Sequence, residues 1–400
     1  MKTAGIICEY NPFHLGHAGH IEKTRRLLGG DCAVVCVMSG NFVQRGDVAV
    51  FRKHARAKMA VLSGADLVVE LPAPYALSSA EGFAHAGVFI LDSLGVCDAV
   101  SFGSESGDIG ALREAAAAIV TPEADALVKE WLGNGMPYAS VLQKAADAVL
   151  GPQSELFKTP NNLLGIEYIK AIAALSSPLA PITVERTGGD HDGETGYSAS
   201  ALRKTLLRGG EPWELMPEAA AAVCMEDISA GLGPVFASQL ELAIMARLRA
   251  TPDFSALPGA AEGLDRRFAR CAASEPSVAD MLAKIKTKRY AMSRIRRMLM
   301  CACLGITAAD TKAPPPYIRV LAMNNTGMEL LRAARKKSRL PVITKPASVI
   351  KLGGRAKELF DLEAAATDFY ALAYPDARNR SGGREWRDTP PVLPPSLLAF

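Results

Sequence analysis

The chain has 400 residues, of which 49% are hydrophobic and 22% charged, and its formal net charge at pH 7 is +3. These values are typical of a soluble globular protein with two or three domains and exclude a disordered chain. No apolar run approaches the ~20 residues of a membrane span and no signal peptide is evident, so we expect no membrane partner. The eight cysteines are scattered without a CxxC pair, so we expect reduced thiols and a cytoplasmic location.

The first half of the chain alternates apolar runs of strand length with amphipathic stretches of helix length. Strands are predicted at residues 4–8, 33–38, 67–70, 99–102 and 182–186. Helices are predicted at residues 16–28, 53–63, 78–94, 109–119, 124–131, 138–149, 161–175 and 199–207. This alternation predicts an α/β fold with a Rossmann-like parallel sheet, in which ligands bind beyond the carboxyl ends of the strands.

The composition changes near residues 209–212, where two glycines, a glutamate and a proline follow one another. We therefore expect a catalytic domain over residues 1–210 and a mainly helical, basic domain over residues 211–400. Helices are predicted in the second domain at residues 234–248, 278–285 and 289–304, and short strand-like pieces at residues 317–323 and 341–344. The last ~25 residues are rich in Pro, Gly and Arg and are expected to be loose.

The first predicted strand is followed by an Asn-Pro turn and then by His-Leu-Gly-His at residues 14–17, which opens the first helix. Free N–H groups and a positive dipole at a helix start suit phosphates, Gly16 lets a nucleotide approach the backbone, and the two imidazoles share one face of the first turn. The pattern is typical of nucleotidyltransferases that bind ATP and release pyrophosphate, so we expect His14 and His17 to be catalytic. The alternatives are histidines of a polar surface loop, since His20 follows, and a zinc site, which is disfavoured because the Glu of HExxH is missing.

A second candidate phosphate site lies at the start of the predicted helix 199–207. Hydroxyls of Ser198 and Ser200, the helix N-terminus and the guanidinium of Arg203 can together bind phosphate oxygens. The alternative is simple capping by Ser198 with Arg203 on a solvated face. Asn162 is a candidate for adenine or ribose, with an ordinary helix start as an equal alternative, and Arg186 is a candidate for adenine stacking or phosphate contact.

Three of the predicted strands are followed by polar segments, which lie at residues 38–47, 103–105 and 186–191. The segment 38–47 has the position and composition of a pocket for the acceptor substrate. The basic helix that follows it, 53–63, is either a solvated face or a contact to an anion or RNA.

The second half of the chain carries two clusters of basic residues, one at residues 284–297 and one at residues 332–339. Charge runs are more often solvated faces, but two clusters in a chain of net charge +3 favour contact with an RNA backbone. The residues predicted to bind RNA are Lys286, Lys288, Arg289, Arg296, Arg297, Lys336 and Lys337.

Several strings, in order from residue 1 to about residue 350, resemble the bacterial tRNA(Met) cytidine acetate ligases, which belong to the HUP-type, HxGH nucleotidyltransferases. The strings lie at residues 5–17, 38–46, 64–72, 101–105 and 285–290. The resemblance implies activation of acetate by ATP to acetyl-adenylate and pyrophosphate, then transfer of the acetyl group to N4 of the wobble cytidine of elongator tRNA(Met), forming N4-acetylcytidine. It implies Mg²⁺ held through the ATP phosphates with no metal site on the protein, and no acetyl-CoA; the oligomeric state stays open.

The resemblance also implies which residues bind ATP. Besides Gly103, Asn162 and Arg186, these are the residues of one N-terminal segment: Ile7, Cys8, Glu9, Tyr10, Asn11, Pro12, Phe13, His14, Leu15, Gly16, His17, Ala18, Gly19 and His20. The Ser-x-Ser-x-x-Arg stretch at 198–203 replaces the bulkier Ile-Ser-Ser-Thr form of other nucleotidyltransferases, which leaves open which hydroxyl contacts phosphate.

Two other functions compete with acetate ligation. An adenylyltransferase that makes a dinucleotide cofactor would share the HxGH site but needs no basic second domain. An RNA-associated protein that binds ATP without catalysis would bind tRNA tightly and release no pyrophosphate. For the ligase, no general base for the N4 proton is evident from the sequence.

Overall fold

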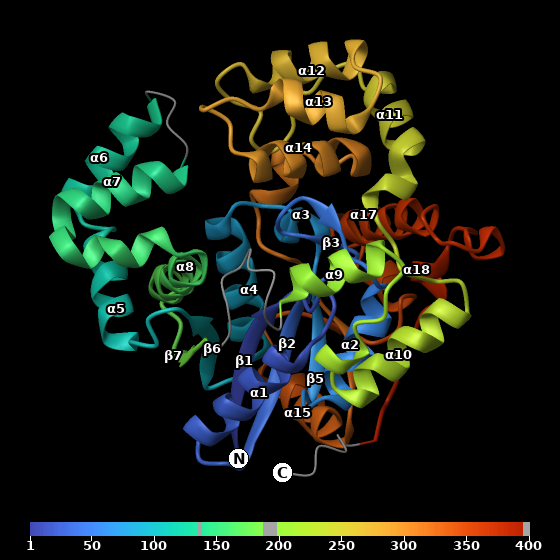
Figure 1. Ribbon diagram of the computed structural model, residues 1–400. Helices are drawn as coiled ribbons and strands as arrows, with labels where there is room; N and C mark the ends of the chain where they lie inside the picture. The colour runs from blue at the N-terminus through green and yellow to red at the C-terminus, as the bar shows by residue number, and fades with distance from the viewer. Residues whose placement is uncertain (134–137, 187–197, 395–400) are drawn as a thin grey trace.

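The computed structural model describes residues 1–133, 138–186 and 198–394. Within these ranges, strands β7-β6-β1-β2-β5-β8-β9 form one sheet in that order (Figure 1). Its parallel part consists of β1 (Lys2–Cys8), β2 (Cys32–Ser39), β5 (Leu67–Leu71), β6 (Ala99–Ser104) and β7 (Ala180–Glu185). These are the five strands predicted from the apolar runs, and the α/β, Rossmann-like fold class is confirmed.

The rest of the sheet comes from the second half of the chain. β8 (Ile318–Met323) pairs antiparallel with β5, and β9 (Val342–Ile343) pairs parallel with β8. Every residue of β8 is buried, and the strand covers an edge that β5 would otherwise leave unpaired. The division into domains at residue 210 stays a prediction, but the sheet draws its strands from both sides of that point.

Helices cover both faces of the sheet. Successive side chains of a strand point to opposite faces, and because these strands are apolar throughout, both faces must be shielded from water. One face, with Ile7 and Val35, is covered by α4 (Ala80–Leu94), α8 (Pro160–Ala174) and α15 (Asn325–Lys337). The other face, with Ile6 and Val34, is covered by α1 (Leu15–Leu27), α2 (Lys53–Leu62), α9 (Ala199–Leu207) and α10 (Glu218–Ser229).

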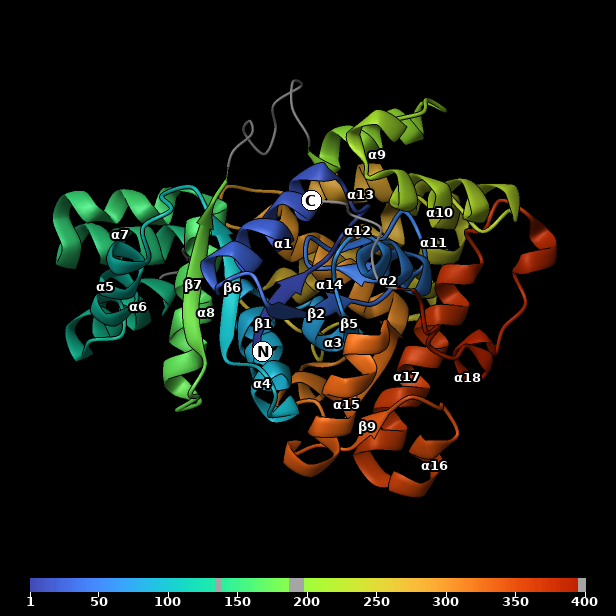
Figure 2. The ribbon, with the colours of Figure 1, turned by 90° about the horizontal axis from the view of Figure 1, so that it is seen from below.

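A separate hydrophobic core joins four helices that we call the helical module: α11 (Glu241–Ala250), α12 (Leu264–Ser274), α13 (Val278–Ile285) and α14 (Met292–Leu304). The module lies beyond the carboxyl ends of the parallel strands, above the sheet in Figure 1 and behind it in the view from below (Figure 2). The bounds of α13 are those predicted. The helix α12 was missed because three arginines make the segment polar on average, although its buried face is apolar throughout.

The remaining elements surround this frame. They are β3 (Phe42–Val43), β4 (Asp47–Val48), α3 (Ala73–Ala76), α5 (Ile109–Ala118), α6 (Pro122–Gly133), α7 (Tyr138–Leu150), α16 (Ser348–Leu352), α17 (Gly354–Ala371) and α18 (Arg384–Arg387), with short 3₁₀ helices among them. Both views place α5 to α7 at one end of the sheet, beside β6 and β7 (Figures 1 and 2). No helix in the described ranges is long and apolar enough to cross a membrane.

The C-terminal tail is anchored where the sequence predicted a loose segment. Glu385 on α18 is fully buried, and the Leu393 N–H donates a hydrogen bond to the carbonyl of Met323 at the end of β8 (2.8 Å). The composition of the tail could not reveal these partners, because they lie in β8 and α17; residues 395–400 lie outside the described residues. All eight cysteines are free and seven of them are buried.

Candidate active site

The two histidines of the HxGH motif hold each other at the start of α1. His14 is the N-cap, and its Nδ1 accepts a hydrogen bond from the Gly16 N–H (3.0 Å), while its own backbone N–H donates to Nδ1 of His17 (3.2 Å). The two rings stack with centroids 3.7 Å apart. Because both Nδ1 atoms accept, each neutral ring carries its proton on Nε2, from which it can be donated to a phosphate oxygen.

Burial keeps these rings neutral at physiological pH. Burial first, and then the charges of Arg186 and Arg203, lower the pKa of His14 to about 4. Burial, followed by His14 and Arg186, lowers the pKa of His17 well below its ordinary value. The imidazoles are therefore hydrogen-bond donors without charge, and the positive charge of the site comes from the two arginines and the helix dipole.

His20 lies one turn further along α1 and contacts the sheet. Its Nε2 is 3.1 Å from Oγ of Ser101 on β6, and burial, followed by the charge of Arg186, lowers its pKa to about 4. No group of three or more His, Cys, Asp or Glu side chains that could hold a metal ion occurs among the described residues.

Arg186 and Arg203 reach the same place from two further elements. Arg186 follows β7, and a Cβ on Gly103 would lie 3.1 Å from its Cγ, so the glycine at the end of β6 makes room for this side chain. Arg203 on α9 donates from Nη1 to the carbonyl of Asn11 (2.7 Å). Since both arginines act on the pKa of His14, the structure brings these predicted ATP residues together from four parts of the sequence.

Asn162 is buried at the start of α8 and holds the loop that follows β6. Its Oδ1 accepts hydrogen bonds from the backbone N–H groups of Glu105 (3.0 Å) and Ser106 (3.1 Å). The carboxylate of Glu105 accepts in return from the N–H groups of Asn161 and Asn162, and although burial opposes it, these bonds lower the pKa of Glu105. This reciprocal pair supports the ordinary structural role, and contact of Asn162 with adenine or ribose stays a prediction.

Ser198 caps α9, with its Oγ accepting from the Ala201 N–H (3.1 Å), and Ser200 lies on the same first turn. The capping role was the simpler of the two alternatives, and phosphate contact by either hydroxyl stays a prediction. Of the polar segment predicted at 186–191, only Arg186 is described; residues 187–191 lie outside the described ranges.

The predicted acceptor segment, residues 38–47, is fixed to the end of β1 and to the helical module. Oε1 of Glu9 accepts from the Gln44 N–H (2.6 Å). Gly46 has φ +74°, and a Cβ on it would lie 2.3 Å from the backbone nitrogen of Arg297 on α14. The segment therefore lies between the HxGH site and the basic helix α14.

Three basic residues of the helix that follows this segment, Lys53, His54 and Arg56, are buried, which excludes a solvated face or an RNA contact for them, whereas Lys58 is partly exposed and pairs with Glu226 (2.6 Å). Arg56 is fully buried and donates to the carbonyls of Phe51 (2.9 Å), Ser39 (3.0 Å), Glu9 and Gly40. It thereby joins the end of β1 to the acceptor segment. The charge of Arg56 suggested an exposed side chain. Only the tertiary structure shows the backbone carbonyls that accept the hydrogen bonds of its guanidinium group.

The two basic clusters lie at opposite ends of the parallel strands. Lys286, Lys288 and Arg289 lie between α13 and α14, and Arg296 and Arg297 lie on α14. Lys336 and Lys337 end α15, which is drawn below the sheet in Figure 1.

The position of the second cluster follows from one contact. A Cβ on Gly95, which ends α4 just before β6 begins, would lie 2.8 Å from the carbonyl oxygen of Lys337. The second cluster is thus at the amino ends of the parallel strands, away from His14 and His17, and the structure does not bring the two clusters together.

The chain is similar to a group of RNA-modifying enzymes along its whole length. The HIGH Nucleotidyl Transferase family matches residues 1–385. The tRNA(Met) cytidine acetate ligase of Acetivibrio thermocellus is 37% identical, over 96% of this chain and 98% of the relative. That of Caldanaerobacter subterraneus is 38% identical, over 94% of this chain and 96% of the relative.

Solved structures show the same similarity. The crystal structure of Thermotoga maritima TmcAL bound with alpha-thio ATP has a TM-score of 0.91 and 33% identity, and the match covers 98% of this chain and 100% of that chain. The apo form of the same protein has a TM-score of 0.92 and 32% identity, with the same coverage.

Proposed function

The chain belongs to the HIGH nucleotidyl transferases and, within them, to the tRNA(Met) cytidine acetate ligases, and we propose that it acetylates the wobble cytidine of elongator tRNA(Met) with ATP and acetate. One observation carries the first step of this chemistry: two neutral, stacked imidazoles at a helix N-terminus, with Arg186 and Arg203 beside them. The relative solved with alpha-thio ATP supports ATP as the nucleotide. The free, mostly buried cysteines support a cytoplasmic location.

In the first step, a carboxylate oxygen of acetate attacks the α-phosphorus of ATP, and the bond to the bridging oxygen of pyrophosphate breaks. Acetate is a weak nucleophile, so the site must hold it in line and stabilise the charge that develops on the leaving group. The Nε2–H groups of His14 and His17 and the N–H groups at the start of α1 are donors for that charge. Mg²⁺ bound to the phosphates would neutralise part of the remaining charge.

In the second step, N4 of the cytidine attacks the acetyl carbonyl, AMP leaves and N4 loses a proton. The cytidine must leave its stack to reach the carbonyl, which single-stranded RNA loops permit. The acceptor segment at residues 38–47 is our candidate for this entry point, because Glu9 and Gly46 hold it between the ATP residues and α14.

The two competing functions make different demands on the second half of the chain. An adenylyltransferase that forms a dinucleotide does not need a basic helical module packed against the acceptor segment. A non-catalytic ATP-binding protein gives no reason for two Nε2–H donors at the phosphate site. Relatives that match along almost their whole length and are named as ligases favour acetate ligation over both.

The test is ATP–pyrophosphate exchange by the purified protein with Mg²⁺, first without tRNA, with and without acetate. Exchange that depends on acetate establishes carboxylate activation, and transfer of labelled acetate to tRNA(Met) then establishes the ligase. If exchange is absent without tRNA, it is repeated with bulk tRNA, because binding of tRNA first is the remaining route for a ligase. Absence of exchange under both conditions would contradict the proposal.

A further inference from the structure

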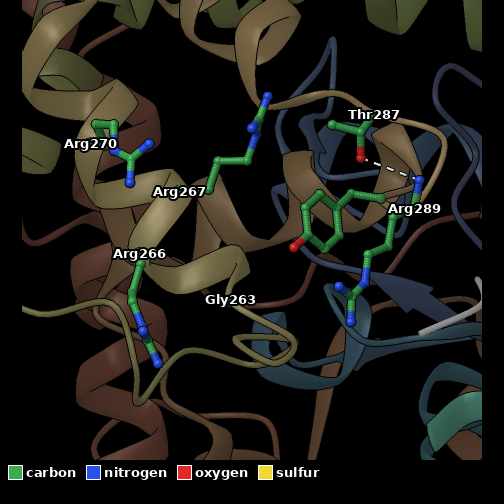
Figure 3. Close-up of a pocket in the computed structure, with 7 residues that line it drawn as sticks. Gly263, Arg266, Arg267, Arg270, Thr287 and Arg289 are labelled. Carbon is green, nitrogen blue, oxygen red and sulfur yellow. Dashed lines mark hydrogen bonds between the residues drawn. The ribbon is translucent and has the colours of Figure 1, made fainter. Parts of the chain in front are cut away.

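A hollow of about 520 Å³ opens on the helical module, between α12 and the connection from α13 to α14 (Figure 3). Four of its seven lining residues are arginines; the lining consists of Gly263, Arg266, Arg267, Arg270, Thr287, Arg289 and Tyr290. We call it the arginine pocket. Of the four arginines, the sequence pointed only to Arg289, because α12 was not predicted as a helix.

Two of the arginines have no partner within the part of the chain that the structure describes. Arg266 and Arg270 are exposed, lie four residues apart on one face of α12, and neither makes a hydrogen bond or ion pair there. Like charges at this spacing destabilise a helix by roughly 0.2–0.5 kcal/mol. Because no carboxylate within the described ranges compensates this repulsion, an anionic ligand is its simplest explanation.

The other side of the pocket is rigid. Arg267 donates from Nε to the carbonyl of Ile285 (3.0 Å) and so ties α12 to the end of α13. The Arg289 N–H donates to Oγ1 of Thr287 (3.2 Å), and its guanidinium lies 5.9 Å from the ring centroid of Tyr290. The hydroxyl of Tyr290 donates to the carbonyl of Glu262 (2.7 Å), so the ring is fixed as a platform.

The segment of the chain that forms this pocket is strongly basic. Between residues 264 and 304 there are ten Lys and Arg residues against three Asp and Glu residues, whereas the whole chain has a net charge of only +3. The rest of the chain is therefore acidic on balance. An extended basic surface in an otherwise acidic protein selects a polyanion over a single small anion.

The pocket also adjoins the acceptor segment. Arg289 and Arg294 both pair with Glu262 at its edge (3.5 and 3.2 Å). Arg294 lies on the same first turns of α14 as Arg296 and Arg297. Gly46 of the acceptor segment packs against these last two residues. Basic groups thus run from the acceptor segment along the start of α14 to α12.

We propose that the arginine pocket binds phosphodiester groups of the same RNA whose base enters the catalytic site, with Arg266 and Arg270 as the contacting groups. Guanidinium forks match phosphate oxygens in pairs and fix position without reading sequence. The inference rests on the proposed function for the identity of the RNA and assigns residues to its binding that the sequence did not indicate.

The test replaces Arg266→Ser and Arg270→Ser together and measures the tRNA dissociation constant at several salt concentrations. Loss of two phosphate contacts should weaken binding about tenfold at low salt and reduce the slope of log K against log salt by roughly 1.4–1.8. Acetate-dependent ATP–pyrophosphate exchange without tRNA should stay at the wild-type rate, which also shows that the variant is folded.

The matched control is Lys345→Ser with Lys351→Ser, which removes two exposed charges around α16, beyond β9 at the far edge of the sheet. Equal effects of both double variants on tRNA binding would overturn the proposal, since only net charge would then matter. Arg266→Lys with Arg270→Lys should restore most of the salt slope.

Three further outcomes test the pocket proposal and the proposed function separately. A changed KM for ATP or pyrophosphate in the RNA-free exchange assay would assign the pocket to a free phosphate compound and overturn our inference. Wild-type protein that shows acetate-dependent exchange but binds no tRNA would refute the RNA pocket and leave carboxylate activation intact. Absence of exchange with normal tRNA binding would refute the ligase while the pocket proposal stands.

Discussion

The sharpest prediction concerns the two Nε2–H donors at the start of α1. Replacing His14→Ala together with His17→Ala removes both donors and leaves Arg186 and Arg203 in place. If the donors act on the charge that develops as pyrophosphate leaves, acetate-dependent exchange should fall at saturating ATP, because the loss is in the transition state.

The expected size follows from the geometry. Removing one donor to a developing oxyanion costs about 10²–10³ in kcat, roughly 2.7–4 kcal/mol. The two rings are in contact, with centroids 3.7 Å apart, so their effects will not simply add, and we expect the double variant to lose at least about 10³-fold. His14→Ala also removes the N-cap acceptor for the Gly16 N–H, which costs about 1 kcal/mol of stability.

The control for that structural cost is His14→Asn, whose side-chain oxygen can still accept from the helix N-terminus. It should restore stability but not the full rate, because its amide does not reach as far as Nε2. The assay is acetate-dependent exchange, with tRNA affinity measured alongside and expected to stay near that of the wild type. A double variant that exchanges within tenfold of the wild-type rate would refute the assignment of these histidines.

Three further predictions concern the support of the site. Burial lowers the pKa of His54 to about 3, and neither ring nitrogen has a hydrogen-bond partner among the described residues. The imidazole takes up a proton below about pH 6.5 in the unfolded chain, so the free energy of unfolding decreases as the pH falls from 6.5 toward 3, by about 2 kcal/mol at pH 5. His54→Leu should reduce the fall in the free energy of urea unfolding between pH 7 and pH 5 by that amount, and an unchanged fall would show that the ring is not buried neutral. Lys53→Met leaves the buried Glu70 without its partner at 2.7 Å and should lower the free energy of unfolding by about 3–5 kcal/mol, where a loss below 1 kcal/mol would contradict the buried pair. Gly46→Ala forces a Cβ against Arg297 and should lower tRNA acetylation while acetate-dependent exchange continues, so an equal loss of both activities would argue against a separate acceptor segment.

The strands of the sheet could be predicted because burial on both faces leaves a simple signal. All eight residues of β2 are buried, and a parallel strand covered on both sides appears in the sequence as a continuous apolar run. β8 gave the same signal and was recognised as strand-like. Its place beside β5 could not be predicted, because a pairing between Leu67 and Met323 depends on contacts that no local pattern records.

The positions of the candidate phosphate-binding residues in the fold were also predictable in large part. A strand, a turn and His-x-Gly-His form a local pattern, so His14 and His17 could be placed on the first turn of a helix before the structure was known. Arg186 and Arg203 could be proposed because each sits at the end of a strand or the start of a helix. The tautomer of the two imidazoles could not be predicted, because it depends on which backbone N–H each Nδ1 meets.

Charged residues misled the sequence analysis in two opposite ways. On α2, Arg56 and Lys53 suggested an exposed face, yet both are buried by carbonyl and carboxylate partners from distant segments. On α12, the arginines of the exposed face, Arg266 and Arg270 among them, made the segment look like a polar loop, although Leu264, Phe268, Cys271 and Ala272 form a buried face at helical spacing. The number of charges in a segment therefore says little about exposure until the partners of those charges are known.

A closed ring of buried polar contacts explains why the C-terminal segments matter to the acceptor segment. The Lys53 N–H donates to Oδ1 of Asn41 (2.8 Å), and Nδ2 of Asn41 donates to Oγ1 of Thr367 on α17 (3.3 Å). The Thr367 hydroxyl donates to Glu385 on α18 (2.9 Å), whose carboxylate pairs with Nζ of Lys53 (2.8 Å) and closes the ring.

Burial opposes ionisation of Glu385, but Lys53 and then Arg319 lower its pKa to about 2, so the ring carries charge at neutral pH. Buried ion pairs contribute little net stability relative to apolar residues, because desolvation cancels most of their attraction. What this ring provides is position: Asn41 has one place where its amide satisfies both Lys53 and Thr367. The segment that we propose receives the cytidine is thus held by residues more than 300 positions away. The second half of the chain therefore shapes this segment, in addition to carrying the surface that we propose binds RNA.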